Sequence, residues 1–428
     1  MSSSIEIHPL AAPPDATITV PGSKSLSNRA LLAAALADGS CTLTGALFSD
    51  DTRLMAGALR TLGVEVVEDE ARARFQVRGT GGSVPAKHAD LFIGNSGTTA
   101  RFLTGYVALG HGRYRIDGTP RMRERPIQPL LDALSTLGVR ATAENGTGCP
   151  PVIVEATGIQ GGNAEIAGSL SSQYLTSLLL VAPYMEDGLD VAVAGALVSR
   201  PYIDLTIGLM AAFGVEVAEP EVNRFRVPGN QRYIARDYAV EPDASAASYF
   251  FAAAAVTGGR VRIPGLGTHT KQGDLRFVEV LEQMGCSVSR SEDAVEVVGP
   301  ERLCGVTVDM GGISDTAQTL AAIAPFADAP VRITGVAHNR VKETDRVGAT
   351  ATELRRLGVR VEEHPDGLTI YPSPVRPAEV ETYDDHRMAM SFAVTSLVAP
   401  GVRIRNPECV SKTFPRFFET LAELAAAS

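Results

Sequence analysis

One pattern recurs along the chain roughly every 73 residues, and this repeat limits the possible folds more than any other feature. Each repeat holds an apolar helix with a polar start, a short strand, an amphipathic helix that ends at a glycine, and two alternating strands. Glycine after a helix is the usual left-handed stop. Five such glycines with matching flanks argue against an accidental periodicity. They are Gly63, Gly138, Gly214, Gly285 and Gly358.

The first helix and the first following strand of six successive repeats can be placed from the same pattern. The helices are expected to begin near Ser25, Thr98, Ser171, Ala244, Asp315 and Asp384. The strands after them are Cys41–Thr44, Tyr114–Ile116, Asp190–Val193, Arg260–Ile263, Val331–Ile333 and Val402–Ile404. Proline is tolerated in the first turn of a helix, and we place Pro126, Pro201 and Pro415 near the first turn of three second helices.

The sixth repeat is incomplete. It stops at its second helix, Phe417–Ala427, and has no pair of closing strands. The strand Ile5–Ile7, near the other end of the chain, has no partner in this scheme. We therefore predict that the N-terminal strand completes the sixth repeat. Because the period exceeds the roughly 20–50 residues of most solenoids, two compact groups of three repeats are favoured over one rod.

The repeat also predicts where the helix starts lie. Right-handed crossovers make both helices of a repeat point the same way, so all helix N-termini of a group gather at one end. Helix N-termini carry partial positive charge. Two groups that face each other would therefore form a cleft ringed by positive helix ends.

Composition narrows the class of protein. A chain of 428 residues with 45% hydrophobic and 21% charged residues is typical of a globular protein with two or three domains. A net charge of −10 argues against non-specific nucleic-acid binding. The five cysteines form no CxxC pair, which favours a reduced, cytoplasmic compartment over structural zinc. We find no signal or transit segment, and the apolar runs are too short to span a membrane.

The segment Pro21–Arg29 stands between a strand-like run, Thr17–Val20, and the first apolar helix. Lys24 and Arg29 crowd the helix start, although a cation there opposes the helix dipole by about 0.3–1 kcal/mol. An anion bound between the cations and the helix end explains this placement. A solvated Lys and Arg on an exposed turn is the alternative. The segment is not a nucleotide-binding Walker A loop, because it lacks the required glycines.

Polar side chains mark the helix starts of the second and third repeats as well. Asn95–Arg101 includes Gly97, which lets a ligand approach the backbone. Three arginines fall within Arg121–Pro126, and hydroxyl and amide groups gather in Ser169–Gln173 and again in Ser199–Tyr202. Capping explains one serine at a helix start, but not three serines and a glutamine. Exposed basic loops and ordinary caps remain the alternatives.

The fifth and sixth repeats add carboxylates to these cations. Asp315 stands at a helix start, and Arg340–Arg346 places Lys342 and Arg346 on one helical face beside Glu343. An N-cap aspartate and a solvated charged turn are the alternatives. Although the protein is acidic, many of its Lys and Arg residues lie at the predicted helix starts. The ligands should therefore carry several negative charges. These cations are Lys24, Arg29, Arg101, Arg125, Lys342, Arg346, Arg387 and Lys412.

Together these segments resemble the EPSP synthase (3-phosphoshikimate 1-carboxyvinyltransferase) branch of the enolpyruvyl transferase family. The resemblance spans nearly the whole chain, through Pro21–Ser25, Gly94–Thr98, Arg121–Ile127, Ser171–Gln173, Arg340–Arg346, Asp384–Met390 and Lys412–Pro415. It implies an α/β fold, a two-domain inside-out α/β barrel of six βαβαββ-type repeats with three in each domain. It also implies one domain of residues 1–22 and 242–428, a second of residues 23–241, and an active site in the interdomain cleft.

The resemblance implies an activity in the shikimate pathway, which leads to chorismate and the aromatic amino acids. The family transfers the enolpyruvyl group of phosphoenolpyruvate to the 5-hydroxyl of shikimate 3-phosphate and releases phosphate, by addition and elimination through a tetrahedral intermediate. No metal or organic cofactor is implied. The expected partners are these two small molecules and the inhibitor glyphosate, with no nucleic acid and no membrane, and we expect a cytoplasmic monomer.

The roles of individual residues follow from the same resemblance. Asp315 is expected to act as base at the hydroxyl, Glu343 as proton donor at the methylene carbon, and Lys24 to contact both substrates. The expected shikimate 3-phosphate site comprises Lys24, Ser25, Arg29, Ser171, Ser172, Gln173, Ser199, Tyr202, Asp315, His338, Asn339 and Lys342. The expected phosphoenolpyruvate site comprises Lys24, Gly97, Arg125, Gln173, Arg346, Arg387 and Lys412.

The chain departs from the family pattern at two positions. His338 replaces an asparagine of many relatives, so either His338 or Asn339 contacts the substrate phosphate. Phe102 replaces a proline, whereas Gly97, rather than alanine, predicts sensitivity to glyphosate.

Two rival functions stay open at this point. The sister enzyme that uses UDP-N-acetylglucosamine typically carries a cysteine in the loop that corresponds to Thr119–Arg125, and this chain has none there. A non-catalytic binder of a phosphorylated metabolite would need the cations but has no use for Asp315 and Glu343.

Overall fold

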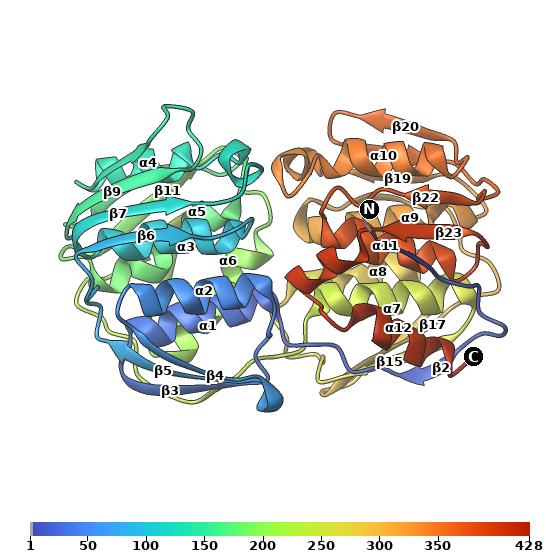
Figure 1. Cartoon of the computed structure of the whole chain (residues 1–428), viewed down its shortest axis with the longest axis horizontal. Coiled ribbons are helices and arrows are strands. Elements are labelled where there is room, and N and C mark those ends of the chain that lie inside the picture. Colours follow the sequence, from blue (N-terminus) through green and yellow to red (C-terminus); the bar gives the residue numbers. More distant parts are fainter. Residues whose placement is uncertain (1–2) are drawn as a thin grey trace. The chain divides into compact units, whose positions relative to one another are not determined.

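The computed structural model describes residues 3–428, and its chain separates into two compact domains (Figure 1). The central domain is continuous and comprises Gly22–Val240. The split domain combines the segment that ends at Pro21 with Glu241–Ser428. Each domain has its own apolar core.

The central domain contains three repeats, and each forms one small four-stranded sheet. The first repeat uses β14 (Tyr238–Ala239), α1 (Lys24–Leu36), β3 (Asp38–Thr44), α2 (Asp50–Thr61), β4 (Glu65–Asp69) and β5 (Arg74–Thr80). The second uses β6 (His88–Phe92), α3 (Gly97–Ala108), β7 (His111–Asp117), α4 (Gln128–Thr136), β8 (Arg140–Ala143) and β9 (Val152–Thr157). The third uses β10 (Gly162–Ala167), α5 (Ser172–Val181), β11 (Leu189–Ala194), α6 (Pro201–Ala212), β12 (Ala218–Glu221) and β13 (Arg224–Val227).

The split domain contains the other three repeats. The fourth uses β2 (Asp15–Thr17), α7 (Ala244–Thr257), β15 (Arg260–Pro264), α8 (Phe277–Gln283), β16 (Ser287–Arg290) and β17 (Ala294–Val298). The fifth uses β18 (Thr307–Asp309), α9 (Ala317–Ile323), β19 (Val331–Thr334), α10 (Arg346–Arg356), β20 (Val361–His364) and β21 (Gly367–Ile370). The sixth uses β22 (Ala378–Val380), α11 (His386–Ser396), β23 (Val402–Arg405), α12 (Phe417–Ala425) and β1 (Ser4–Glu6).

The first helices of the repeats form the centre of each domain. In the central domain α1, α3 and α5 pack against one another, and in the split domain α7, α9 and α11 do the same. These helices are buried on nearly all sides, as their alanine- and leucine-rich sequences predict. The predicted α/β class and the six-repeat organisation are therefore confirmed, with six small sheets in residues 3–428.

Two repeats exchange their first strands. Strand β2 precedes α1 in the chain but pairs in parallel with β15 of the fourth repeat. Strand β14 precedes α7 but pairs in parallel with β3 of the first repeat. The strand-like run Thr17–Val20 therefore ends earlier than predicted, because the chain leaves the sheet after the Ile18 N–H donates to the Arg262 carbonyl.

The N-terminal strand β1 pairs antiparallel with β23, with Ile5 opposite Ile404. The sheet order is β1-β23-β22, so β1 occupies an edge where the sixth repeat has no closing strands of its own. The strand spans Ser4–Glu6, one residue earlier than the predicted Ile5–Ile7.

Helix boundaries follow the predictions except at polar turns. All five closing glycines have positive φ. The helices predicted near Asp315 and Asp384 begin two residues later, because a 3₁₀ segment and a left-handed turn precede them. Pro126 and Pro415 lie two residues before α4 and α12 rather than in their first turns. Among residues 3–428, no helix has both the length and the apolar character that a membrane span requires.

Candidate active site

In the split domain, the carboxylate of Asp315 lies among three cations. Its Oδ1 is 2.7 Å from Lys342 Nζ and 3.2 Å from Arg346 Nη1, and its Oδ2 is 2.6 Å from Arg387 Nη2. Lys342 lies in the segment before α10, Arg346 is the first residue of α10, and Arg387 lies in the first turn of α11. Asp315 therefore does not cap α9, which begins at Ala317 without a side-chain cap.

Arg346 connects this cluster to two further carboxylates. Its Nη2 is 2.8 Å from Glu343 Oε2, and its Nε is 2.7 Å from Asp385 Oδ2. The side chain is only 2% exposed. Burial alone lowers the pKa of Arg346, but Asp385, Glu343 and Asp315 outweigh it, so the pKa lies above its usual value. Arg346 is thus a permanent cation shared by three carboxylates.

Ser314 connects Lys342 to His338. The Lys342 Nζ donates to Ser314 Oγ over 3.2 Å, and the hydroxyl lies 2.9 Å from His338 Nε2. Burial and the neighbouring Lys342 lower the pKa of His338 to about 3, so its ring is neutral. Asn339 Nδ2 donates to the Ser314 carbonyl over 2.8 Å. His338 and Asn339 therefore both position the segment that carries Lys342.

A second guanidinium nitrogen of Arg387 reaches Tyr249. Arg387 Nη1 donates to the Tyr249 hydroxyl over 3.1 Å, from α11 to α7. Burial raises the pKa of Tyr249 to about 12, so the phenol is neutral. Lys412 ends the 3₁₀ segment Pro407–Lys412 and is buried.

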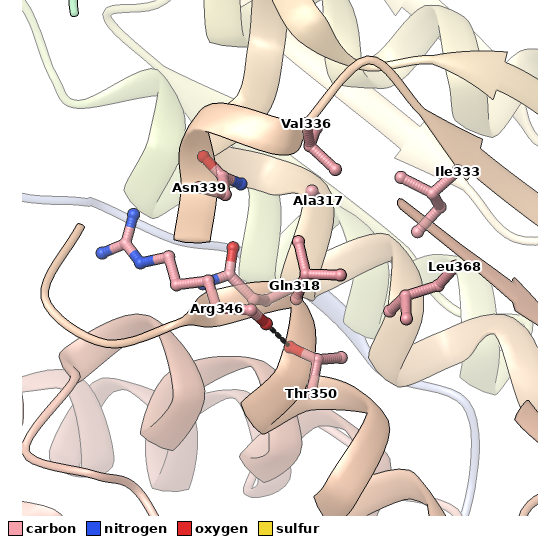
Figure 2. Close-up of a pocket in the computed structure, with 9 residues that line it drawn as sticks. Ala317, Gln318, Ile333, Val336, Asn339, Arg346, Thr350 and Leu368 are labelled. Atoms are coloured by element: carbon pink, nitrogen blue, oxygen red, sulfur yellow. Dashed lines mark hydrogen bonds between the residues drawn. The ribbon is translucent and has the colours of Figure 1, made fainter. Parts of the chain in front are cut away.

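A narrow pocket lies beside Arg346, between α9 and α10 (Figure 2). Apolar side chains form most of its wall, but Gln318 and Asn339 also line it. Both amide atoms of Gln318 and the Oδ1 of Asn339 have no hydrogen-bond partner among the described residues. The pocket has the size of about one water molecule, so it has no room for a substrate.

In the central domain, the start of α1 carries Lys24 and Arg29 in different surroundings. Lys24 Nζ lies 3.8 Å from Asp51 Oδ2, and its side chain is 12% exposed. Arg29 is 2% exposed and donates to Thr206 Oγ1, the Ser25 carbonyl and the Tyr202 carbonyl. Burial lowers the pKa of Arg29 to about 10, which still leaves it charged near neutral pH. The alternative of a solvated, exposed turn is therefore wrong for this segment.

Gly97 and Arg125 lie in contact at the start of α3. Arg125 Nη1 donates to the Asn95 carbonyl over 3.0 Å, and a Cβ built on Gly97 would lie 2.4 Å from Arg125 Nη2. Arg101, by contrast, donates to the carbonyls of Gly97 and Pro126. Arg101 therefore fixes the backbone on both sides of the contact between Gly97 and Arg125.

The starts of α5 and α6 supply the polar groups predicted there. Ser171 caps α5 by accepting from the Gln173 N–H over 3.2 Å. Gln173 Nε2 donates to Thr98 Oγ1 over 3.4 Å, which connects α5 to α3. Ser199 adopts a left-handed φ of 54° before α6, whose first turn contains Tyr202. Capping by Ser171 accounts for one of the predicted polar groups and leaves Ser172 for another role.

Comparison with known proteins identifies the family. Residues 11–421 match the family model described as EPSP synthase (3-phosphoshikimate 1-carboxyvinyltransferase). The chain belongs to the EPSP synthase family. It is 54% identical to 3-phosphoshikimate 1-carboxyvinyltransferase of Nostoc punctiforme over 424 residues, covering 98% of this chain and 100% of that protein. It is 46% identical to the chloroplastic enzyme of Petunia hybrida, covering 95% of this chain and 82% of that protein.

Solved structures agree with the EPSP synthase assignment. EPSP synthase from Acinetobacter baumannii matches with a TM-score of 0.81 and 26% identity, covering 98% of this chain and 97% of that chain. The enolpyruvyl transferase NikO from Streptomyces tendae matches with a TM-score of 0.77 and 20% identity, covering 98% and 97%. The NikO match shows the shared fold alone.

Five of the predicted residues of the split domain form one connected network. Asp315, Lys342, Glu343, Arg346 and Arg387 are joined directly. The predicted residues of the central domain gather at the starts of α1, α3, α5 and α6.

Sequence reasoning missed four residues that contact predicted site residues or their neighbours. Three of them, Ser314, Tyr249 and Asp385, lie beside predicted residues or in an apolar helix, where they look like ordinary capping or core positions. The fourth, Asp51, lies in the first turn of α2 and pairs with Lys24. Among residues 3–428, no group of three His, Cys, Asp or Glu side chains is placed to hold a metal ion.

Proposed function

We propose that the catalytic work of this EPSP synthase is carried out by Asp315 and Glu343 in the split domain, together with Lys24 of the central domain. The reaction is the transfer of the enolpyruvyl group of phosphoenolpyruvate to the 5-hydroxyl of shikimate 3-phosphate, with release of phosphate. The observation that carries the proposal is the carboxylate of Asp315 held among three cations next to Glu343.

The chemistry needs one group that accepts a proton and one that donates it. A proton from Glu343 adds to the methylene carbon of phosphoenolpyruvate, which makes C2 electrophilic. The 5-hydroxyl oxygen attacks C2 while its proton passes to Asp315. In the second step the ionised Glu343 takes a proton back from the new methyl group, the bond from C2 to the phosphate oxygen breaks, and the departing phosphate takes the proton from Asp315. Each carboxyl group returns to its starting state.

The substrates bring negative charges that can replace the carboxylate partners of these cations. In the structure, Lys342 and Arg387 are neutralised by Asp315. We propose that substrate phosphate and carboxylate oxygens compete for these cations and leave Asp315 able to act as a base. Arginine suits such oxygens because its planar fork donates two parallel hydrogen bonds. Arg125, Arg346, Arg387 and Lys412 are the groups that we assign to phosphoenolpyruvate.

Shikimate 3-phosphate is assigned to hydroxyl, amide and ammonium groups. We place its phosphate near Ser171, Ser172 and Gln173, where helix N–H groups and hydroxyls can share it. Lys24 and Lys342 lie on different domains, so both domains contribute to the reaction in this proposal. Closure on ligand binding is expected to shorten the radius of gyration, which small-angle scattering with shikimate 3-phosphate and glyphosate would measure.

The decisive experiment is phosphate release from purified protein mixed with both substrates. Shikimate 3-phosphate should support steady release, and UDP-N-acetylglucosamine should not. Phosphate release only when the sugar nucleotide is the acceptor for phosphoenolpyruvate would assign the protein to the sister activity. Binding of both ligands without any release would favour the non-catalytic alternative.

Three further properties belong to the same proposal. Glyphosate is expected to inhibit by occupying the phosphoenolpyruvate site, where Gly97 leaves room beside Arg125. A cytoplasmic location agrees with five cysteines that are all free in residues 3–428. We also propose a monomer, which light scattering after size-exclusion chromatography would test.

A further inference from the structure

The turn that precedes α11 has an unusual backbone. Tyr383 and Asp384 both have φ of 55°, in the left-handed region that non-glycine residues rarely adopt. Two consecutive residues persist there only where their surroundings hold them in place. The turn leads directly to Asp385, which caps α11, and to Arg387, which contacts Asp315.

A buried carboxylate on α10 holds this turn. Glu353 is 0% exposed, and its Oε1 accepts from the Tyr383 hydroxyl over 2.7 Å. Its Oε2 accepts from the Glu381 N–H over 3.0 Å and lies 2.9 Å from Arg356 Nη1. The carboxylate of Glu381 in turn accepts from the Tyr383 N–H over 3.4 Å. The Glu353 carboxylate therefore contacts this segment at two points, the side chain of Tyr383 and the backbone of Glu381.

The same helix holds the turn at a second point. Arg346 stands two helical turns before Glu353 on α10, and its Nε lies 2.7 Å from Asp385 Oδ2. Between them, Thr350 contacts Met388 of α11 through the methionine sulfur. One face of α10 thus contacts both ends of the segment from Glu381 to Asp385. A change at either contact is passed to the start of α11.

We propose that Glu353 is a positioning residue, which holds Tyr383 and thereby keeps the left-handed turn in the conformation that aims Arg387 at the reacting groups. This inference rests on the proposed function of Arg387 as a phosphoenolpyruvate ligand. It gives a role to Tyr383, which directly precedes the segment Asp384–Met390. The proposed reaction does not use Tyr383. The ion pair with Arg356 does not explain why Glu353 is buried, because a cation on an exposed helix face can be solvated by water.

Tyr383→Phe tests the contact by removing one hydroxyl. The change should raise KM for phosphoenolpyruvate by about tenfold, the lower end of the range expected for a lost hydrogen bond to a charged group. KM for shikimate 3-phosphate should stay within about twofold, since its proposed groups lie on other segments. The matched control is Tyr371→Phe, whose hydroxyl donates to the exposed Glu362 over 2.9 Å. An equal rise in both KM values, or none, would overturn the inference.

Glu353→Gln and a rescue variant separate positioning from stability. Glu353→Gln keeps the side-chain shape and should reproduce the selective rise in KM. Glycine adopts the left-handed conformation without a steric penalty, so adding Asp384→Gly to Tyr383→Phe should recover part of the lost affinity. A variant that melts at a lower temperature but retains both KM values would show a merely structural role and would refute the proposal.

A crystal structure of Glu353→Gln tests the same step without turnover. We expect Tyr383 or Asp384 to leave the left-handed region and the 2.6 Å contact between Arg387 and Asp315 to be lost. An unchanged turn would refute the inference even if the wild-type protein released phosphate. Absence of phosphate release by the wild type, with a displaced turn in the variant, would instead refute the proposed function alone.

Discussion

Arg387 Nη2 lies 2.6 Å from Asp315 Oδ2, although the two residues are 72 positions apart in the sequence. The contact joins the start of α11 to the 3₁₀ segment before α9. The buried arginine favours the carboxylate form of the proposed base. Substrate charges can replace charged groups that are paired with one another in this way.

Glu343→Gln should lower kcat by roughly 10²–10⁴-fold, the usual contribution of a general acid or base. The amide keeps the shape of the side chain and can still accept from Arg346, so KM values should change much less than kcat. Steady-state phosphate release at several concentrations of each substrate measures both. Glu301→Gln, on an exposed loop, is the control. A kcat within threefold of the wild type would remove Glu343 from the role of proton donor.

Gly97→Ala should weaken binding of phosphoenolpyruvate and of glyphosate together. The new Cβ would lie 2.4 Å from Arg125 Nη2, so the guanidinium must move away from the start of α3. Inhibition curves at fixed phosphoenolpyruvate measure the effect, which should be at least tenfold on the glyphosate concentration for half inhibition.

Gly57→Ala is the matched control for this change. A Cβ there would meet its nearest atom, Arg60 Nη2, only at 3.9 Å. Alanine in the interior of α2 should leave inhibition unchanged and stabilise the fold by about 0.5–1 kcal/mol. If Gly97→Ala left glyphosate inhibition as it was, the contact between Gly97 and Arg125 would have no bearing on that site.

The repeats were predictable from the sequence because their signals are local. A glycine such as Gly138 stops a helix through its own backbone freedom, and an apolar helix such as α7 shows its burial in its composition. The exchange of β2 and β14 was not predictable in this way. Which sheet a parallel strand joins depends on contacts such as that between Asp15 and Arg260, which are 245 positions apart.

The same distinction applies to the site. Cations at helix starts, such as Lys342 and Arg387, could be recognised because they oppose the helix dipole. Whether such a cation is aimed at a ligand or at the backbone could not be predicted. Arg101 was grouped with the ligand-facing cations, yet its donors go to the carbonyls of Gly97 and Pro126. Which groups a guanidinium faces depends on how other repeats pack around it. The sequence of one segment does not contain that information.

Gln318→Met should stabilise the split domain. Both amide atoms of Gln318 are buried without a hydrogen-bond partner among the described residues, and methionine fills a similar volume without polar atoms. An unsatisfied buried polar group costs about 1–3 kcal/mol, so the free energy of unfolding should rise by about 1 kcal/mol or more. Urea unfolding measures it, with Gln283→Met at the exposed end of α8 as control. Destabilisation by Gln318→Met would mean that the amide has partners in solution.

His338→Asn should flatten the dependence of stability on pH. The pKa of His338 is lowered in the folded protein from 6.5 to about 3, chiefly by burial, so between these values the unfolded chain binds more protons than the folded one. This contribution is fully present above pH 6.5 and is lost as the pH falls toward 3, at up to about 1.4 kcal/mol per pH unit.

Urea unfolding at pH 7.5 and pH 5 measures this difference for the wild type and for the variant. The wild type should lose more stability than His338→Asn over that interval, because asparagine does not titrate and can still accept from Ser314. His364→Asn is the control, since that ring is partly exposed. Equal losses for the wild type and His338→Asn would mean that the ring is protonated in the folded protein. The ring would then donate the hydrogen bond that it shares with Ser314.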